Sequence, residues 1–183
     1  MNISELNDSR HKILEQLNDE LNENSVAAVL RNEEGAPEMI SALLDELGDG
    51  DRGIIGDFYF KPLTSEEDPA QIFMSVFTIS DNIPVERLPA LYEAISYVNF
   101  NLPAGCFSID KDHRFLCYVL STILPIELSE EEAYVQTDMS VSNALFFADG
   151  YIGILCDVLD GKVEPDGVIE FLGGPDEDTD SEE

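Results

Sequence analysis

Residues 105–124 read GCFSIDKDHRFLCYVLSTIL and predict a β-hairpin. Two runs rich in aromatic and β-branched residues, 105–110 and 114–124, flank a polar turn at 111–113. The second run is apolar on both of its faces, so we expect it to lie inside a sheet and not at its edge.

The register of this hairpin depends on the length of its turn. Two turn residues would place Cys106 opposite Cys117, whereas three would place Phe107 opposite Cys117. The second register puts Phe107, Ile109, Cys117 and Val119 together on one apolar face. Because burial of a coherent face sets register, we favour this pairing and expect Cys117 to be a buried thiol without a redox role.

A second pair of strands precedes the hairpin. Residues 53–61 (GIIGDFYFK) and 71–80 (QIFMSVFTIS) have strand composition and are joined by the polar linker 62–69. Residues 84–99 carry apolar side chains at helical spacing, with prolines confined to the start, and predict a helix between the two hairpins.

A long helix follows the second hairpin. Ser129 and Glu132 form a capping-box pattern at its start, Gly150 is a point where it could bend or break, and Gly161 ends it. One apolar stripe is formed by Val141, Leu145, Ala148, Ile152, Leu155 and Leu159. A second stripe lies beside it and consists of Phe147, Tyr151, Ile154 and Val158. Packing on one face of a sheet requires a single stripe, so the second is a candidate partner or dimer surface.

The N-terminal region has helical character. Residues 4–21 predict an amphipathic helix, residues 26–30 are apolar and ambiguous, and residues 37–47 predict a short helix that begins at Pro37 and ends before Gly48. The fold class is therefore α+β: a twisted antiparallel sheet with helices packed on one face, in the order α(α)ββαββα.

Three regions follow from this order. Residues 1–50 form an N-terminal helical region packed on the core, and residues 51–172 form the α+β domain. Residues 173–183 are a glycine-containing acidic tail, which we expect to be disordered.

Composition excludes several classes of function. The 183 residues include 39 acidic and 9 basic side chains, for a net charge of -30, so the clustered lysine and arginine that nucleic acids require are missing. Anionic membranes are disfavoured by the same repulsion, and no apolar run of about 18 residues predicts a membrane span. The three cysteines lack a regular spacing, and the N-terminus has no signal-peptide pattern, so we expect a cytoplasmic protein.

The sequence predicts no catalytic, metal or cofactor site. Its two histidines are His11, in the amphipathic helix, and His113, in a polar turn, and neither can be paired with a nucleophile. Zinc motifs do not occur. Residues 45–56 resemble a calcium loop but place Leu47 and Gly56 where an EF-hand needs oxygen ligands, so a turn is the better interpretation.

Residues 97–110, YVNFNLPAGCFSID, carry a family resemblance. The pattern formed by Asn99, Asn101, Gly105 and Phe107 resembles the YbjN-like family of bacterial proteins, and the element order is similar from about residue 52 to residue 161. The resemblance implies a fold like that of type III secretion chaperones, a cytoplasmic and often dimeric protein, and no established enzyme activity; the family label speaks of sensory transduction regulation. Physically, Asn99 can cap a helix end and Gly105 permits a sharp entry into the strand, which are fold-setting roles.

Together these features predict a non-catalytic protein-interaction module. It would be chaperone-like or regulatory and would bind a segment of a partner protein as a homodimer, without a cofactor. The alternative is an acidic inhibitor, of the immunity or DNA-mimic type, that neutralises a basic partner.

Overall fold

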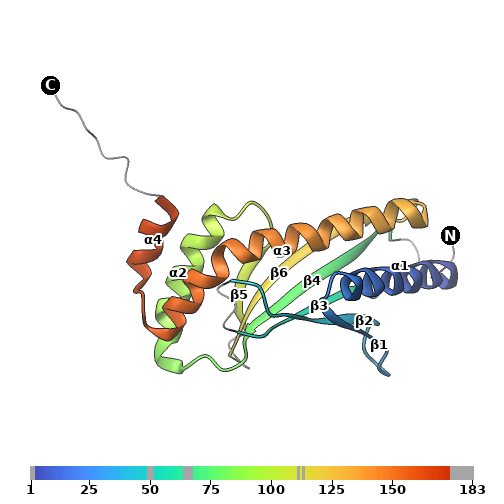
Figure 1. Ribbon diagram of the computed structural model, residues 1–183. Helices are drawn as coiled ribbons and strands as arrows, with labels where there is room; N and C mark the ends of the chain where they lie inside the picture. Colours follow the sequence, from blue (N-terminus) through green and yellow to red (C-terminus); the bar gives the residue numbers. More distant parts are fainter. Residues whose placement is uncertain (1–2, 49–51, 64–67, 111, 113, 174–183) are drawn as a thin grey trace.

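The computed structural model describes residues 3–48, 52–63, 68–110, 112 and 114–173. It is a six-stranded antiparallel sheet with helices packed on one face (Figure 1), which confirms the predicted α+β class. The elements are α1 (Ile3–Glu23), β1 (Ala27–Arg31), β2 (Met39–Leu44), β3 (Ile54–Phe60), β4 (Ala70–Ser80), η1 (Val85–Arg87), α2 (Leu88–Asn101), β5 (Cys106–Asp110), β6 (Phe115–Pro125), α3 (Glu130–Asp160) and α4 (Pro165–Gly173).

The strands lie in the order β1-β2-β3-β4-β6-β5, so strands from before and after residue 50 share one sheet. A row of aromatic side chains crosses its covered face. Phe77, Tyr118 and Phe107 come from neighbouring strands, with ring centroids 5.7 and 5.1 Å apart, and all three are at most 2% exposed. This row anchors the core, because buried aromatic pairs contribute more than their burial alone.

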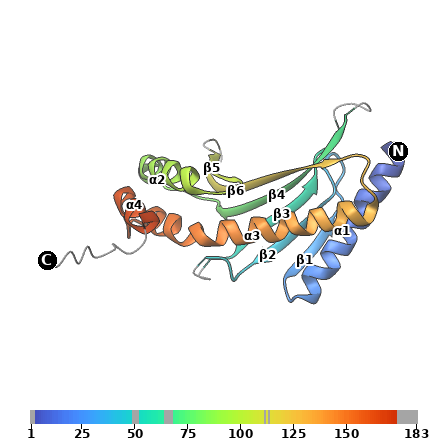
Figure 2. The same ribbon diagram turned by 90° about the horizontal axis from the view of Figure 1, so that it is seen from above.

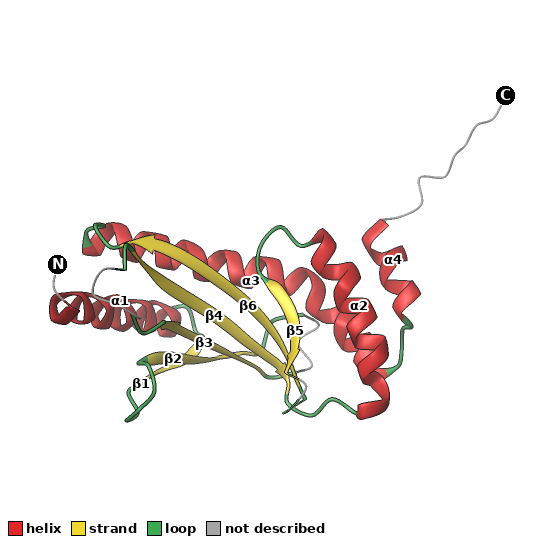
Figure 3. Ribbon diagram, turned by 180° about the vertical axis from the view of Figure 1, so that it is seen from behind, coloured by secondary structure: helices red, strands yellow, loops and turns green. Residues whose placement is uncertain are grey.

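The helices form a layer over this one face. Helix α1 contacts β1 and β2, α3 contacts β4 and β6, and α2 contacts β5 (Figure 2). From behind, the strands face the viewer with the helices beyond them or at their end (Figure 3). No helix that the structure describes therefore covers the opposite face of the sheet.

Helix α3 begins with the predicted capping box: Glu132 N–H donates to Ser129 Oγ, and the Glu132 carboxylate accepts from Ser129 N–H. It runs unbroken through Gly150 and ends at Gly161, which has a φ of 73°. The helix is long and apolar enough to cross a membrane, yet its buried stripe packs on the sheet as a core helix.

The helix predicted at residues 37–47 is wrong. This segment forms β2, which pairs with β1 on one side and β3 on the other. Ile40, Ala42 and Leu44 alternate toward the core, which is a period of two and not of 3.6. The ambiguous residues 26–30 contribute the edge strand β1.

The predicted hairpin register is also wrong. Asp110 lies opposite Phe115, so Phe107 pairs with Tyr118, and Ser108 pairs with Cys117. The turn is longer than predicted because Arg114 adopts a positive φ of 59° within it. Cys117 consequently faces away from the core and is half-buried, while the buried thiol is Cys156.

The C-terminal region contains one helix that the sequence did not predict. Helix α4 packs mainly against α2 and buries Val168. The disorder predicted for residues 173–183 concerns residues outside the described part of the chain, apart from Gly173 at the end of α4.

Candidate functional site

The first candidate surface is the uncovered face of the sheet, which we call the open face. It consists of the strand residues that alternate with the core positions. Its four most exposed apolar side chains are Val29 (50% exposed), Leu43 (40%), Ile55 (42%) and Ile123 (69%). The same face also carries Ile72, Met74, Val76, Cys117 and Val119, which are all partly buried.

The open face carries little charge. Among its strand positions, Arg31, Asp57 and Asp110 are the charged residues, giving a formal charge of -1 where the whole chain has -30. Asp57 accepts a hydrogen bond of 2.6 Å from Ser41 Oγ, which satisfies part of its carboxylate within the sheet. A surface both apolar and weakly charged is unusual on a protein this acidic, and such surfaces mark sites of association.

The second candidate surface is a hollow of about 430 Å³ between α3 and α4, which we call the α3–α4 groove. Its apolar lining comes from Pro103, Phe146, Phe147, Tyr151, Phe171 and Leu172. Phe146 is 76% exposed and stands edge-on to the half-buried ring of Phe147, with centroids 5.6 Å apart. Asp149 is its charged lining residue.

Phe146 also borders a hollow of about 390 Å³ on the other flank of α3, where Leu43 and Leu47 line the opposite side. It therefore forms an apolar ridge between two depressions. The sequence did not single out Phe146, although an aromatic residue off both helical stripes was the signal that could have found it.

The residues of the second stripe have different environments. Val158 is fully buried and belongs to the core. Phe147, Tyr151 and Ile154 are partly buried against that core, and two of them, Phe147 and Tyr151, line the α3–α4 groove. The stripe therefore supplies the floor of a surface whose exposed rim is Phe146 and Phe171.

The family-motif residues join α2 to β5. The side-chain amide of Asn99 donates to Phe107 C=O at 2.9 Å, and its oxygen accepts from Phe107 N–H at 2.8 Å. Asn101 Nδ2 donates to Tyr97 C=O at 3.0 Å, within the last turn of α2. Gly105 has a φ of 75°, and a Cβ there would overlap the ring of Tyr118. These contacts fix the chain path from helix to strand.

Comparisons with known proteins reveal similarity in structure alone. No family model matches the chain, and no curated protein matches it. An uncharacterised protein from Methanothermobacter thermautotrophicus aligns with a TM-score of 0.41 and 14% identity, over 82% of this chain and 98% of that one. YbjN from E. coli, named as a candidate transcription regulator, aligns with a TM-score of 0.38 and 12% identity, over 81% and 90%. The chain is structurally similar to YbjN, as the motif predicted, and the likeness concerns the fold.

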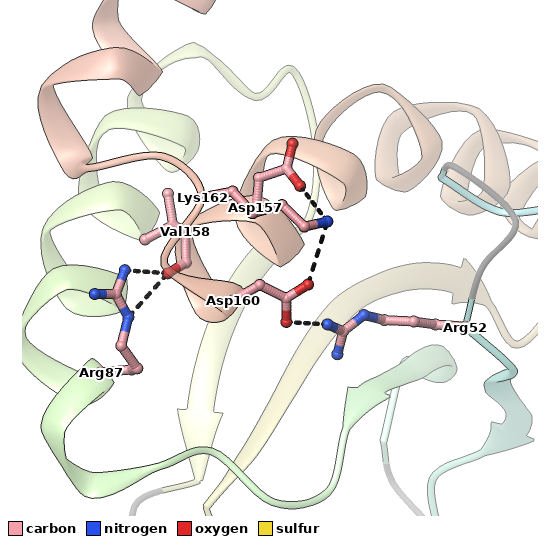
Figure 4. Close-up of polar contacts among 6 residues, drawn as sticks. All are labelled: Arg52, Arg87, Asp157, Val158, Asp160 and Lys162. Atoms are coloured by element: carbon pink, nitrogen blue, oxygen red, sulfur yellow. Dashed lines mark hydrogen bonds and ion pairs between the residues drawn. The ribbon is translucent and has the colours of Figure 1, made fainter.

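Several basic side chains are engaged at the C-terminal end of α3 (Figure 4). Arg87 donates two hydrogen bonds to Val158 C=O, and Arg52 pairs with Asp160. Lys162 contacts Asp157 at 3.0 Å and Asp160 at 3.4 Å. Hydrogen bonding to Arg52 holds the pKa of Asp160 below its usual value. Cations at this position complement the partial negative charge of the helix terminus.

The described residues contain no group of three or more His, Cys, Asp or Glu side chains that could hold a metal. Two side chains have raised pKa values where α1 packs on α3. Burial, with a hydrogen bond to Glu20, raises the pKa of Tyr134 to about 12, and burial also raises the pKa of Asp138. The adjacent groove of about 500 Å³ is lined by side chains that are mostly exposed, so these pKa shifts accompany helix packing and not an enclosed reaction cleft.

Proposed function

We propose that the chain is a non-catalytic, cytoplasmic protein-interaction module that dimerises through its open face and presents its helices to a partner protein. One observation carries this proposal: in a chain of charge -30, an uncovered sheet face has only three charged strand positions. Two copies that met through α1 or through the first turn of α3 would bring acidic residues together. Two open faces would bring together valine, isoleucine, leucine and methionine.

The size of the open face suits such a contact. Six strands spaced about 4.8 Å apart span about 24 Å, and the longest strands extend over about 37 Å at 3.4 Å per residue. Because the edge strands are shorter, the usable area is on the order of 700 Å². Stable interfaces bury about 800 Å² on each partner. Antiparallel sheets that pack face to face interdigitate apolar side chains in this way.

Sedimentation velocity over a range of concentrations tests the proposal. Val76 and Val119 are directly paired across β4 and β6 at the middle of the open face. We expect Val76→Glu and Val119→Glu each to weaken dimerisation by 100-fold or more, because a carboxylate would be buried without a partner. Val85→Glu is the matched control, since Val85 is 63% exposed in η1, outside the sheet. A wild-type monomer at high concentration would refute the proposal.

The acidic groove between α1 and α3 favours a second candidate, an inhibitor that captures a basic protein. Glu15, Asp19, Glu20 and Glu23 line it, with Lys12 as its basic residue. Capture by this groove would weaken steeply with added salt and with Asp19→Asn or Glu23→Gln, because the attraction would be largely electrostatic. Binding of a basic partner that survives 0.5 M salt would argue against this candidate.

A further inference from the structure

The α3–α4 groove is surrounded by helices that carry no positive charge. Helices α2, α3 and α4 contain no lysine or arginine at all. Asp149 lies in the lining, and Asp166 and Glu170 are exposed on α4. A ligand seated here would therefore meet an apolar floor framed by carboxylates.

The chain that follows α4 adds to this charge. Helix α4 ends at Gly173, directly after the lining residues Phe171 and Leu172. The next ten residues, GPDEDTDSEE, include six acids and no base. In the sequence, therefore, six acids follow closely after the two groove residues of α4.

The floor of the groove is built to receive large apolar side chains. Its volume of about 430 Å³ falls within the ~300–1,000 Å³ typical of ligand pockets. Phe146 and Phe171 are 76% and 51% exposed, which leaves most of one ring and about half of the other available for contact. Exposed aromatic rings beside a hollow are typical anchors of protein interfaces.

From the groove and the charges around it, we infer that the α3–α4 groove binds an amphipathic helix of a partner protein that carries lysine and arginine on its polar face. Its apolar side chains, spaced three and four residues apart, enter the groove against Phe146, Phe147 and Phe171. Its basic side chains meet Asp149 and Glu170, and the six acids that follow Gly173 in the sequence add to the negative charge that attracts it. The acids raise the rate and the strength of the encounter, and the aromatic rings hold the bound helix.

This inference rests on the proposed function, since it names the chemistry of the partner. It uses a different surface from the open face, so the two can fail separately. Loss of dimerisation in Val76→Glu with unchanged groove binding would leave this inference intact. Normal dimerisation without groove binding would overturn this inference alone.

Fluorescence anisotropy with a synthetic peptide tests the groove in the full-length protein. The probe is a labelled helix of lysine and leucine, about five turns long, with leucine at three- and four-residue spacing; a glutamate–leucine helix of the same pattern is the comparison. We expect the lysine peptide to bind and the glutamate peptide to bind at least 50-fold more weakly. Equal binding of both peptides would overturn the inference.

Variants distinguish binding in the α3–α4 groove from nonspecific attraction to the acidic surface of the protein. We expect Phe146→Ser and Phe171→Ser each to weaken binding about 10-fold, at both 50 and 300 mM salt, because each removes an apolar anchor. Phe100→Ser is the matched control: Phe100 is 90% exposed on α2 and does not line the groove, so we expect less than a twofold change. Equal affinity of all three variants and the wild type would overturn the inference. Circular dichroism would check that each variant is folded.

The acidic residues after Gly173 are tested by neutralising them without shortening the chain. Replacing Asp176, Glu177, Asp178, Asp180, Glu182 and Glu183 with their amides should weaken binding several-fold at 50 mM salt. At 300 mM salt, where screening is stronger, we expect little difference. An unchanged dependence of affinity on salt would refute the role given to these residues. A change in self-association with Phe146→Ser would instead identify a second copy as the occupant and overturn the inference.

Discussion

Substitution of Gly105 by alanine should be among the most damaging single changes in this protein. Gly105 has a φ of 75°, and a Cβ at this position would overlap Oη and Cζ of Tyr118. An L-residue in this backbone region costs about 1–2 kcal/mol. Tyr118 is fully buried and donates a hydrogen bond of 2.9 Å to Ala104 C=O, so displacing its ring sacrifices a further ~1 kcal/mol of hydrogen bonding.

Repacking around the displaced ring adds about 1–3 kcal/mol. The expected total is therefore about 3–6 kcal/mol, against a whole-domain stability of about 5–15 kcal/mol. Urea unfolding, followed by circular dichroism at a fixed protein concentration, measures the change. Removing the hydroxyl in the double variant Gly105→Ala/Tyr118→Phe should relieve part of the overlap, so the double variant should be less unstable than the sum of the two single changes.

Gly150→Ala is the internal control because it makes the same chemical change in open space. Gly150 lies inside α3, and a Cβ added there would meet no neighbouring heavy atom within 4 Å. Alanine is favoured over glycine in helices by about 1 kcal/mol, so this substitution should stabilise the protein. A cost below about 1 kcal/mol for Gly105→Ala, or the same sign for both substitutions, would refute the reasoning.

Three further predictions concern separate contacts. Asn99→Ala should cost about 2–3 kcal/mol in urea unfolding, because both the N–H and the C=O of Phe107 would lose their side-chain partner; a cost below about 1 kcal/mol would show that water replaces the amide. A hydrogen bond to Glu38 raises the pKa of His11, so their pairing stabilises the fold below the unfolded pKa of about 6.5, and this stabilisation is lost as pH rises through the folded pKa. Glu38→Gln should lower the pKa of His11 in an NMR titration, and the loss of stability that it causes should shrink from pH 5 to pH 8. The absence of this trend would contradict the pairing. Cys106 is exposed and should react first with a thiol reagent, as peptide mapping after brief labelling would reveal; equal labelling of all three cysteines would contradict the described burial.

The elements with a strong local signal could be predicted from the sequence. Ser129 and Glu132 mark the start of α3 through a contact between residues three apart, and Gly161 marks its end through its own backbone conformation. Both signals are local, so no knowledge of the fold is needed to read them. The pattern of Asn99 and Phe107 belongs to the same class, since its hydrogen bonds span eight residues.

Features that depend on distant partners were harder to predict. Residues 37–47 carry helix-compatible methionine, leucine and glutamate, but Met39–Leu44 becomes β2 because pairing with β1 and β3 outweighs weak local propensity. The hairpin register failed because it depended on Arg114, which takes a positive φ that a sequence seldom reveals. The open face could be read in part from the sequence, because β4 has apolar residues on both of its faces. Ile72, Met74 and Val76 are those that face away from the core.

Charge placement explains why composition favours certain kinds of protein contact without locating their surfaces. Basic residues are few, and several of them contact other residues of the same chain. Arg10 is buried against Phe60, while Arg52 and Lys162 pair with acids at the end of α3. The helices that frame the α3–α4 groove are left with acids alone. The open face, in contrast, is nearly neutral because few charged residues occupy its strand positions. A neutral apolar face suits contact with an identical, equally acidic chain, and an apolar groove among acids suits a basic helix. The same charge of -30 therefore favours two kinds of contact on two sides of one sheet.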